Sequence, residues 1–86
     1  MHDTMLLDNI RKNLEQICKK NCIERVNKLK VSVSLDSHVN SENLYKHLNN
    51  TNKTLVGEWS EILIEKRENL ESQTAIIESI QGEFKE

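Results

Sequence analysis

The segment Leu29–Leu35 most limits what this chain can fold into, because apolar and polar residues alternate strictly along it. Successive side chains of a β-strand point to opposite faces of a sheet, so the alternation predicts a strand with one buried and one wet face. The residues expected to be buried are Leu29, Val31, Val33 and Leu35. The residues expected to face water are Lys30, Ser32 and Ser34. The rest of the chain must therefore cover one side of this strand.

An amphipathic helix is predicted from Met5 to about Lys20, where apolar residues recur at helical spacing with charged residues opposite them. Asp3 or Thr4 can cap its start. The apolar stripe of this helix consists of Leu6, Leu7, Ile10, Leu14, Ile17 and Cys18.

A second, shorter helix is predicted after the polar residues Asn40 and Ser41, either of which can cap it. Residues 49–54, NNTNKT, follow it as a polar loop. The side chains that this helix would bury are Leu44, Tyr45 and Leu48.

A second strand is predicted over residues 58–67, EWSEILIEKR, with Trp59 near its start. Ile62 and Ile64 would share one face of it. Only residues 68–73, ENLESQ, separate it from the next apolar segment, a length that suits a hairpin connection.

A third strand is predicted over residues 74–84, TAIIESIQGEF, where the step from Ile77 to Ile80 is three residues rather than two and Gly82 follows. This spacing suggests a β-bulge. The resulting order is helix, strand, helix, strand, strand. It predicts an α+β fold, a two-layer sandwich with two helices on a three-stranded sheet, forming a single domain over residues 1–86.

Composition excludes several classes of protein. The chain of 86 residues is 36% hydrophobic and 30% charged, with a net charge of −2, which is typical of a globular domain. Residues 10–31 are basic and residues 58–86 are acidic, but aromatic residues are scarce, which disfavours a nucleic-acid partner. No apolar run approaches the about 18 residues that would span a bilayer. With no secretory signal in the sequence, a cytoplasmic location is expected.

Cys18 and Cys22 would share one face if both were helical. This spacing favours packing over a disulfide, and two thiols fall short of the four ligands of a structural zinc site. His38 and His47 are expected to be ordinary surface histidines. The sequence contains no recognisable nucleophile or acid–base set, so an enzyme is not expected.

The residues Met1, His2 and Asp3 are the candidate metal ligands. The α-amine, the backbone nitrogen of His2 and its imidazole follow one another, so they can form fused chelate rings around one metal ion. A nitrogen-rich, square-planar site of this kind suits Ni(II) or Cu(II). Asp3 could add an oxygen ligand or orient the imidazole ring. On the residues alone, a frayed terminus is the other interpretation.

Several segments carry a resemblance to the HypA/HybF family of hydrogenase nickel-incorporation proteins. They are MHD at residues 1–3, where the family has Met-His-Glu, residues 6–16, residues 23–48 and residues 74–84. The resemblance implies a nickel-binding metallochaperone or accessory protein for the maturation of a nickel enzyme. It also implies a nickel GTPase as partner and a hydrogenase or urease apoenzyme as recipient.

The chain departs from the family in one large feature. Family members carry a zinc ribbon between the second and third strands, and here that insertion is missing, so no zinc is expected. In addition, Asn40 stands where a family member can have an acidic residue. The alternative hypothesis is therefore a protein-interaction module that keeps the fold without a metal role, binding a partner or a second copy through a charged or sheet-edge surface.

Overall fold

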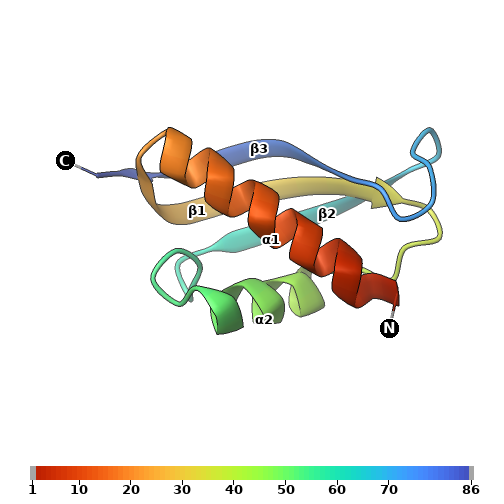
Figure 1. The fold of residues 1–86 in the computed structure, drawn as a ribbon, viewed down its shortest axis with the longest axis horizontal. Coiled ribbons are helices and arrows are strands. Elements are labelled where there is room, and N and C mark those ends of the chain that lie inside the picture. Colours follow the sequence, from red (N-terminus) through yellow and green to blue (C-terminus); the bar gives the residue numbers. More distant parts are fainter. Residues whose placement is uncertain (1, 86) are drawn as a thin grey trace.

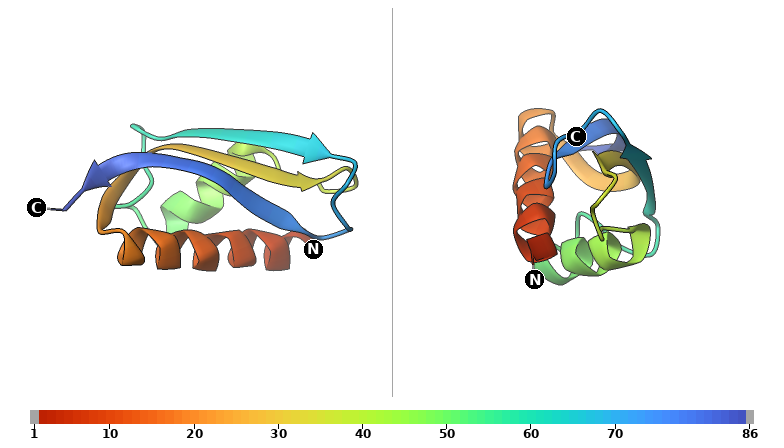
Figure 2. Two further views of the ribbon diagram at one scale, coloured as in Figure 1. Left: turned by 90° about the horizontal axis from the view of Figure 1, so that it is seen from above. Right: turned by 90° about the vertical axis from the view of Figure 1, so that its right-hand side faces the viewer.

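The computed structural model describes the backbone of residues 2–85 and the side chains of residues 4–85. Two helices lie on one face of a three-stranded sheet, and the other face of the sheet is open (Figures 1 and 2). This arrangement confirms the predicted α+β fold and its element order. The elements are α1 (His2–Lys20), β1 (Ile23–Ser34), α2 (Ser41–Thr51), β2 (Glu61–Arg67) and β3 (Ala75–Phe84).

The central strand of the sheet is β1, which pairs with β2 in parallel and with β3 in the antiparallel direction. The prediction of a hairpin between the second and third strands is therefore wrong. Residues 68–74 instead carry the chain past the end of β1, from one edge of the sheet to the other (Figure 2). The longest and most deeply buried strand takes the middle position because its backbone groups are then paired on both sides.

Strand β1 starts at Ile23, six residues before the predicted strand. In the first half of β1, apolar residues do not alternate with polar ones. The pairing with β3 shifts register twice here, between Ile23 and Arg25 and between Val26 and Lys28, so the buried residues are not two positions apart. Such bulges insert an extra residue, so Val26 and Leu29 are both fully buried although they lie three positions apart. A search for alternating apolar and polar residues therefore misses this part of the strand.

The predicted bulge in β3 is confirmed. Lys30 pairs with Ser79 and Val31 with Ile77, which leaves Glu78 as the extra residue of the ladder. Further along the strand, Gly82 pairs with Val26. A Cβ atom at position 82 would collide with the backbone carbonyl oxygen of Arg25, so this close approach of two strands requires glycine.

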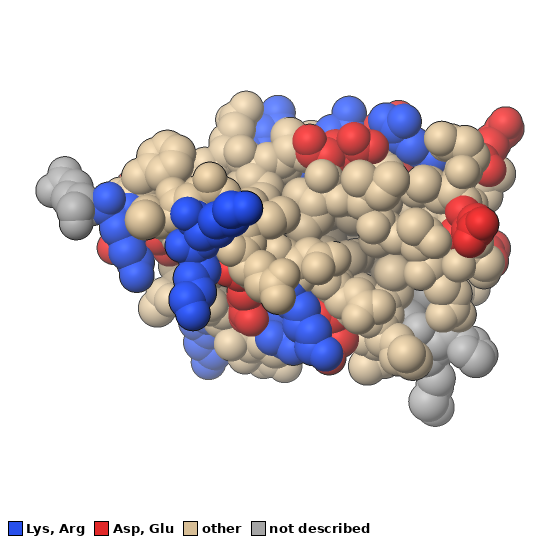
Figure 3. Space-filling model, turned by 45° about the horizontal axis from the view of Figure 1, so that its top comes forward, with Lys and Arg blue, Asp and Glu red and all other residues tan. Residues whose placement is uncertain are grey.

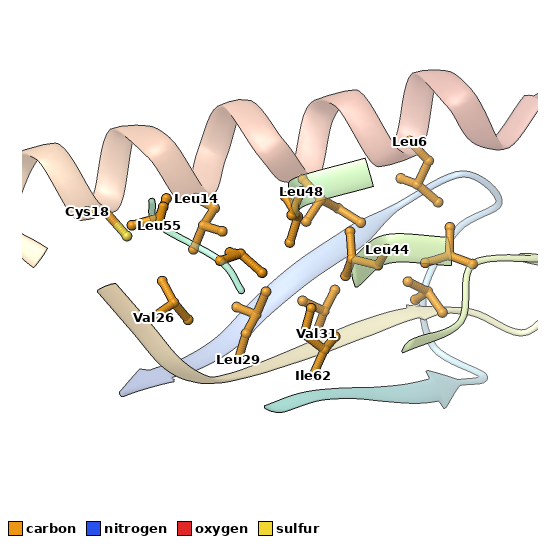
Figure 4. Close-up of a cluster of buried hydrophobic side chains, with 14 residues drawn as sticks. Leu6, Leu14, Cys18, Val26, Leu29, Val31, Leu44, Leu48, Leu55 and Ile62 are labelled. Carbon is orange, nitrogen blue, oxygen red and sulfur yellow. The ribbon is translucent and has the colours of Figure 1, made fainter. Parts of the chain in front are cut away.

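The hydrophobic core lies between the sheet and the two helices (Figure 4). Helix α1 contributes a stripe of spacing four, as its amphipathic pattern predicts. Leu44 and Leu48 of α2 are buried as predicted, whereas Tyr45 is only partly buried. The fully or nearly fully buried residues of α1 and β1 are Leu6, Ile10, Leu14, Cys18, Val26, Leu29, Val31 and Val33.

The polar face predicted for β1 is not wet along its whole length. Ser32 and Ser34 are buried, and Leu35 at the end of the alternation is 54% exposed. Ser32 is covered because its hydroxyl donates to the Glu78 carboxylate at 2.7 Å and accepts from Nε of Arg67 at 3.1 Å. Residues from all three strands thus form a hydrogen-bonded layer over the centre of the open face.

The start of α2 is fixed by Asn40, one of the two predicted caps. Its side chain accepts from the backbone N–H of Asn43 at 2.8 Å, and the Asn43 side chain accepts from the backbone N–H of Asn40 at 2.9 Å. This reciprocal pair satisfies two backbone donors that a helix start would otherwise leave without partners.

Strand β2 begins at Glu61 and not at Glu58 as predicted. The N–H of Ser60 bonds the carbonyl of Gly57 at 2.9 Å, so residues 57–60 form a turn that holds Trp59 outside the strand. The indole ring lies under the guanidinium of Arg25, 5.0 Å from the ring centroid. No helix within residues 2–85 has the length and apolar composition needed to cross a bilayer.

The close contact at Gly82 gives a test of the sheet. Gly82→Ala should lower the free energy of unfolding by about 1–3 kcal/mol, because the added methyl group overpacks the gap between β3 and β1. Gln81→Ala, at the exposed neighbouring position, should change it by less than about 0.5 kcal/mol. Urea unfolding of both variants measures the difference, and equal stabilities would contradict the described packing.

Candidate functional site

The candidate ligands lie at the start of α1. Met1 falls outside the described residues, and His2 and Asp3 form the first helical residues by their backbone, with side chains outside the described part. The first four N–H groups of any α-helix have no acceptor within the helix. The backbone nitrogen of His2 is therefore not committed to a hydrogen bond of α1.

The described residues that follow show how this end of the helix is held. Thr4 and Met5 are exposed, Met5 to 71%, whereas Leu6 is 4% exposed and packs in the core. The helix is thus anchored from Leu6 onward. Thr4 and Met5 lie at an end of the molecule, where a ligand from solution can reach them (Figure 1).

Two loops reach the same end of the molecule, residues 35–40 between β1 and α2 and residues 68–74 between β2 and β3 (Figures 1 and 2). Asp36 joins them, because its carboxylate accepts from the Ser34 hydroxyl at 2.7 Å and from the Ser72 hydroxyl at 2.5 Å. These two hydrogen bonds hold the pKa of Asp36 below its ordinary value, and the bond from Ser72 has the larger effect. A negative charge held by two hydroxyl groups therefore lies at the same end of the molecule as the start of α1 (Figure 1).

The other residues considered for metal binding have different surroundings. His38 is exposed in the loop of residues 35–40. Asn40 uses its side-chain oxygen to cap α2. Within residues 4–85 no group of three or more His, Cys, Asp or Glu side chains could hold a metal ion, and the candidate ligands lie outside that range.

The two cysteines do not share a helix face, because α1 ends at Lys20 before Cys22 is reached. Cys22 is exposed in the turn that follows, with a positive φ of 58°, while Cys18 is 3% exposed in the core. Burial raises the pKa of the Cys18 thiol, and the neighbouring Glu15 carboxylate raises it further. Cys18 is therefore a packing residue, as predicted, and both thiols are free.

One polar contact between the helices was not predicted from the sequence. Nε2 of His47 on α2 lies 3.3 Å from Oδ1 of Asp8 on α1, and Nε of Arg11 lies 3.1 Å from the same oxygen. The Arg11 guanidinium lowers the pKa of Asp8 below its ordinary value against a smaller opposing effect of burial, and His47 lowers it further. The only sequence signal is that Asp8 and His47 each flank the buried stripe of their own helix.

Comparisons with known proteins identify no relative: no family model, no curated protein and no solved structure matches the chain. The resemblance to the HypA/HybF family therefore rests on the sequence segments given above.

The Asp8 contact predicts a pH dependence. A carboxyl whose pKa is lower in the folded than in the unfolded state stabilises the fold above its unfolded value, about 4. That contribution is lost as the pH falls from about 4 through the lowered pKa of Asp8. Asp8→Asn should therefore lower stability at neutral pH and flatten its decline in acid, as measured by thermal melts between neutral and acidic pH.

Arg11→Gln is the matched variant, because it removes the largest cause of the shift and leaves Asp8 in place. The double variant should lose less stability than the sum of the two single losses, since the two residues act as a pair. Arg11 also contacts the Glu15 carboxylate at 2.9 Å, so the double variant should still be less stable than Asp8→Asn alone. Additive losses would show that the two residues act independently.

Proposed function

We propose that this chain is a nickel-binding accessory protein that carries Ni(II) at its N-terminus for the maturation of a nickel enzyme. The observation that carries the proposal is the sequence Met1-His2-Asp3, which leads into α1. It is supported by the resemblance of the sequence segments to the HypA/HybF family.

The donor set fits the metal. When Met1 is the first residue, its amine, the His2 backbone nitrogen and the imidazole provide three nitrogen donors in succession. Nitrogen donors in a square-planar arrangement suit Ni(II), and Cu(II) binds such sites more tightly still. The His2 nitrogen can exchange its proton for a metal ion without breaking a bond of α1, because the first turn has no internal acceptors for its N–H groups.

The proposed role is binding and transfer rather than catalysis. A site at the exposed end of a helix can be approached by another protein without disturbing the core, which begins at Leu6. In this proposal a nickel GTPase and a hydrogenase or urease apoenzyme are the partner and the recipient that the family resemblance implies.

His2→Ala should abolish tight binding of Ni(II), because it removes the imidazole and opens one chelate ring. The melting temperature should hardly change, since the core begins four residues later. Isothermal titration calorimetry with nickel, on untagged protein whose first residue is Met1, measures the effect.

Three further variants sharpen this test. One residue added before Met1 should weaken binding as strongly, because the amine becomes an amide. Asp3→Ala should have a smaller effect if the carboxylate orients the ring. His38→Ala is the matched control and should bind like the wild type. If wild type and His2→Ala bind nickel equally, or neither binds it, the proposal is wrong.

The fold should not depend on a metal. Small zinc domains unfold on chelation because their metal-binding free energy is their folding free energy, whereas this chain has an apolar core between its helices and sheet. Thermal melts with and without EDTA, followed by circular dichroism, should therefore coincide. A loss of helical signal on adding EDTA would disprove the expectation.

A protein-interaction module is the second candidate. The face formed by α1 and β3 has a broad central area without charged side chains (Figure 3). A groove between α1 and β3 is lined by Ile17, Ile77, Ile80 and the 65% exposed Phe84, together with the polar side chains of Asn21, Glu78 and Ser79. Exposed apolar surface of this kind is typical of sites that bind other proteins. This candidate gains support if nickel binding is absent.

A further inference from the structure

Strand β2 has a free edge. It pairs with β1 through seven consecutive residues, from Lys28 opposite Glu61 to Ser34 opposite Arg67, without any shift of register. On its other side no element of the described chain lies beyond it (Figure 2). A regular edge strand presents a row of backbone N–H and C=O groups that another strand can pair with.

The opposite edge of the sheet is less suited to pairing. Strand β3 carries the bulge at Glu78, and its ladder with β1 shifts register in three places. Bulges twist an edge and interrupt its row of hydrogen-bonding groups, which is one way in which proteins protect edge strands. The straight edge of β2 is therefore the available one.

We propose that β2 pairs with β2 of a second copy of this chain, in antiparallel direction and centred on Ile64. A symmetric dimer formed through one strand edge places the two strands antiparallel about a two-fold axis. The two three-stranded sheets then join into one, with the helices of both copies on the same face. This interface does not involve the start of α1, so it is independent of the proposed nickel site.

Charge determines the register. With Ile64 opposite Ile64, Glu61 of each copy lies opposite Arg67 of the other, which gives two opposite-charge pairs by symmetry. A centre on Leu63 would instead place Glu61 opposite Glu65, and a centre on Glu65 would place that residue opposite itself. Only the first of these three registers avoids facing carboxylates, so β2 is complementary to itself.

Arg67 can take part without leaving its present partners. Its Nε bonds Ser32 at 3.1 Å and a terminal nitrogen lies 3.2 Å from the Glu78 carboxylate, while its side chain stays 40% exposed. A guanidinium has five N–H donors, so an additional carboxylate can bind. The partners on β1 and β3 also fix its position, which lowers the entropy lost on pairing.

Apolar contacts would add to this pairing. Ile62, Leu63 and Ile64 line a groove along the β2 edge together with Val39, and Leu63 is 37% exposed. In the register centred on Ile64, Lys66 lies opposite Ile62, where its aliphatic stem can cover the apolar side chain and its ammonium group can reach water. An interface of seven residues per copy is small, so the dimer should be weak and concentration-dependent.

The test is sedimentation velocity over a wide range of protein concentration. The wild type should shift from monomer to dimer. Glu61→Arg and Arg67→Glu should each raise the dissociation constant by about tenfold or more, because each places two like-charged pairs in the interface. An equimolar mixture of the two variants should dimerise again, since arginine and glutamate then face each other at both pairs. Glu58→Arg, the same charge change outside the strand, is the control and should behave like the wild type.

A wild type that stays monomeric at millimolar concentration would overturn the proposal. So would a mixture that dimerises no better than its components. Because Arg67→Glu also removes the contacts with Ser32 and Glu78, a second measurement uses the wild type alone. Hydrogen exchange of the β2 amides should slow as concentration rises while exchange in β3 does not change. Slowing in β3 instead would place the interface at the other edge and disprove pairing through β2.

Discussion

The burial of β1 is the constraint on which the rest of this structure depends. A strand paired along both edges has its backbone groups hydrogen-bonded, but its apolar side chains still have to be covered by other chain segments. The stripes of α1 and α2 cover one face with apolar side chains (Figure 4). On the other face the cover is polar, because Arg67 and Glu78 enclose the hydroxyl of Ser32. The bulge in β3 puts Glu78 in the ladder between the residues paired with Lys30 and Val31, next to this hydroxyl.

Much of the fold was predictable because it follows from local periodicity. The helix stripes, the cap at Asn40 and the bulge at Glu78 all follow from the spacing of residues within about ten positions. Three features were not predictable in this way. The first half of β1 has its alternation broken by register shifts, the burial of Ser32 depends on two other strands, and the pairing of β2 with β1 rather than β3 joins strands that are far apart in the sequence.

The candidate site likewise has parts that could be predicted from the sequence and parts that could not. The metal proposal needs only three consecutive residues, Met1 to Asp3, so it can be made from the sequence and is unaffected by errors in the predicted topology. The contact between Asp8 and His47 joins residues 39 positions apart, and no pattern within either helix specifies their pairing. The self-complementary charge pattern of β2 can be found in its sequence. It predicts an interface only when β2 is known to be an edge strand without bulges.

The order of strands across the sheet also has a consequence for how the protein is made. Strand β3 emerges from the ribosome after every other element, yet it pairs with β1, which emerges early. Until then β1 has one unpaired edge and the polar layer over Ser32 lacks Glu78. The nascent chain therefore exposes one edge of β1, the most deeply buried strand of the folded domain, throughout translation of the later elements, a state prone to aggregation.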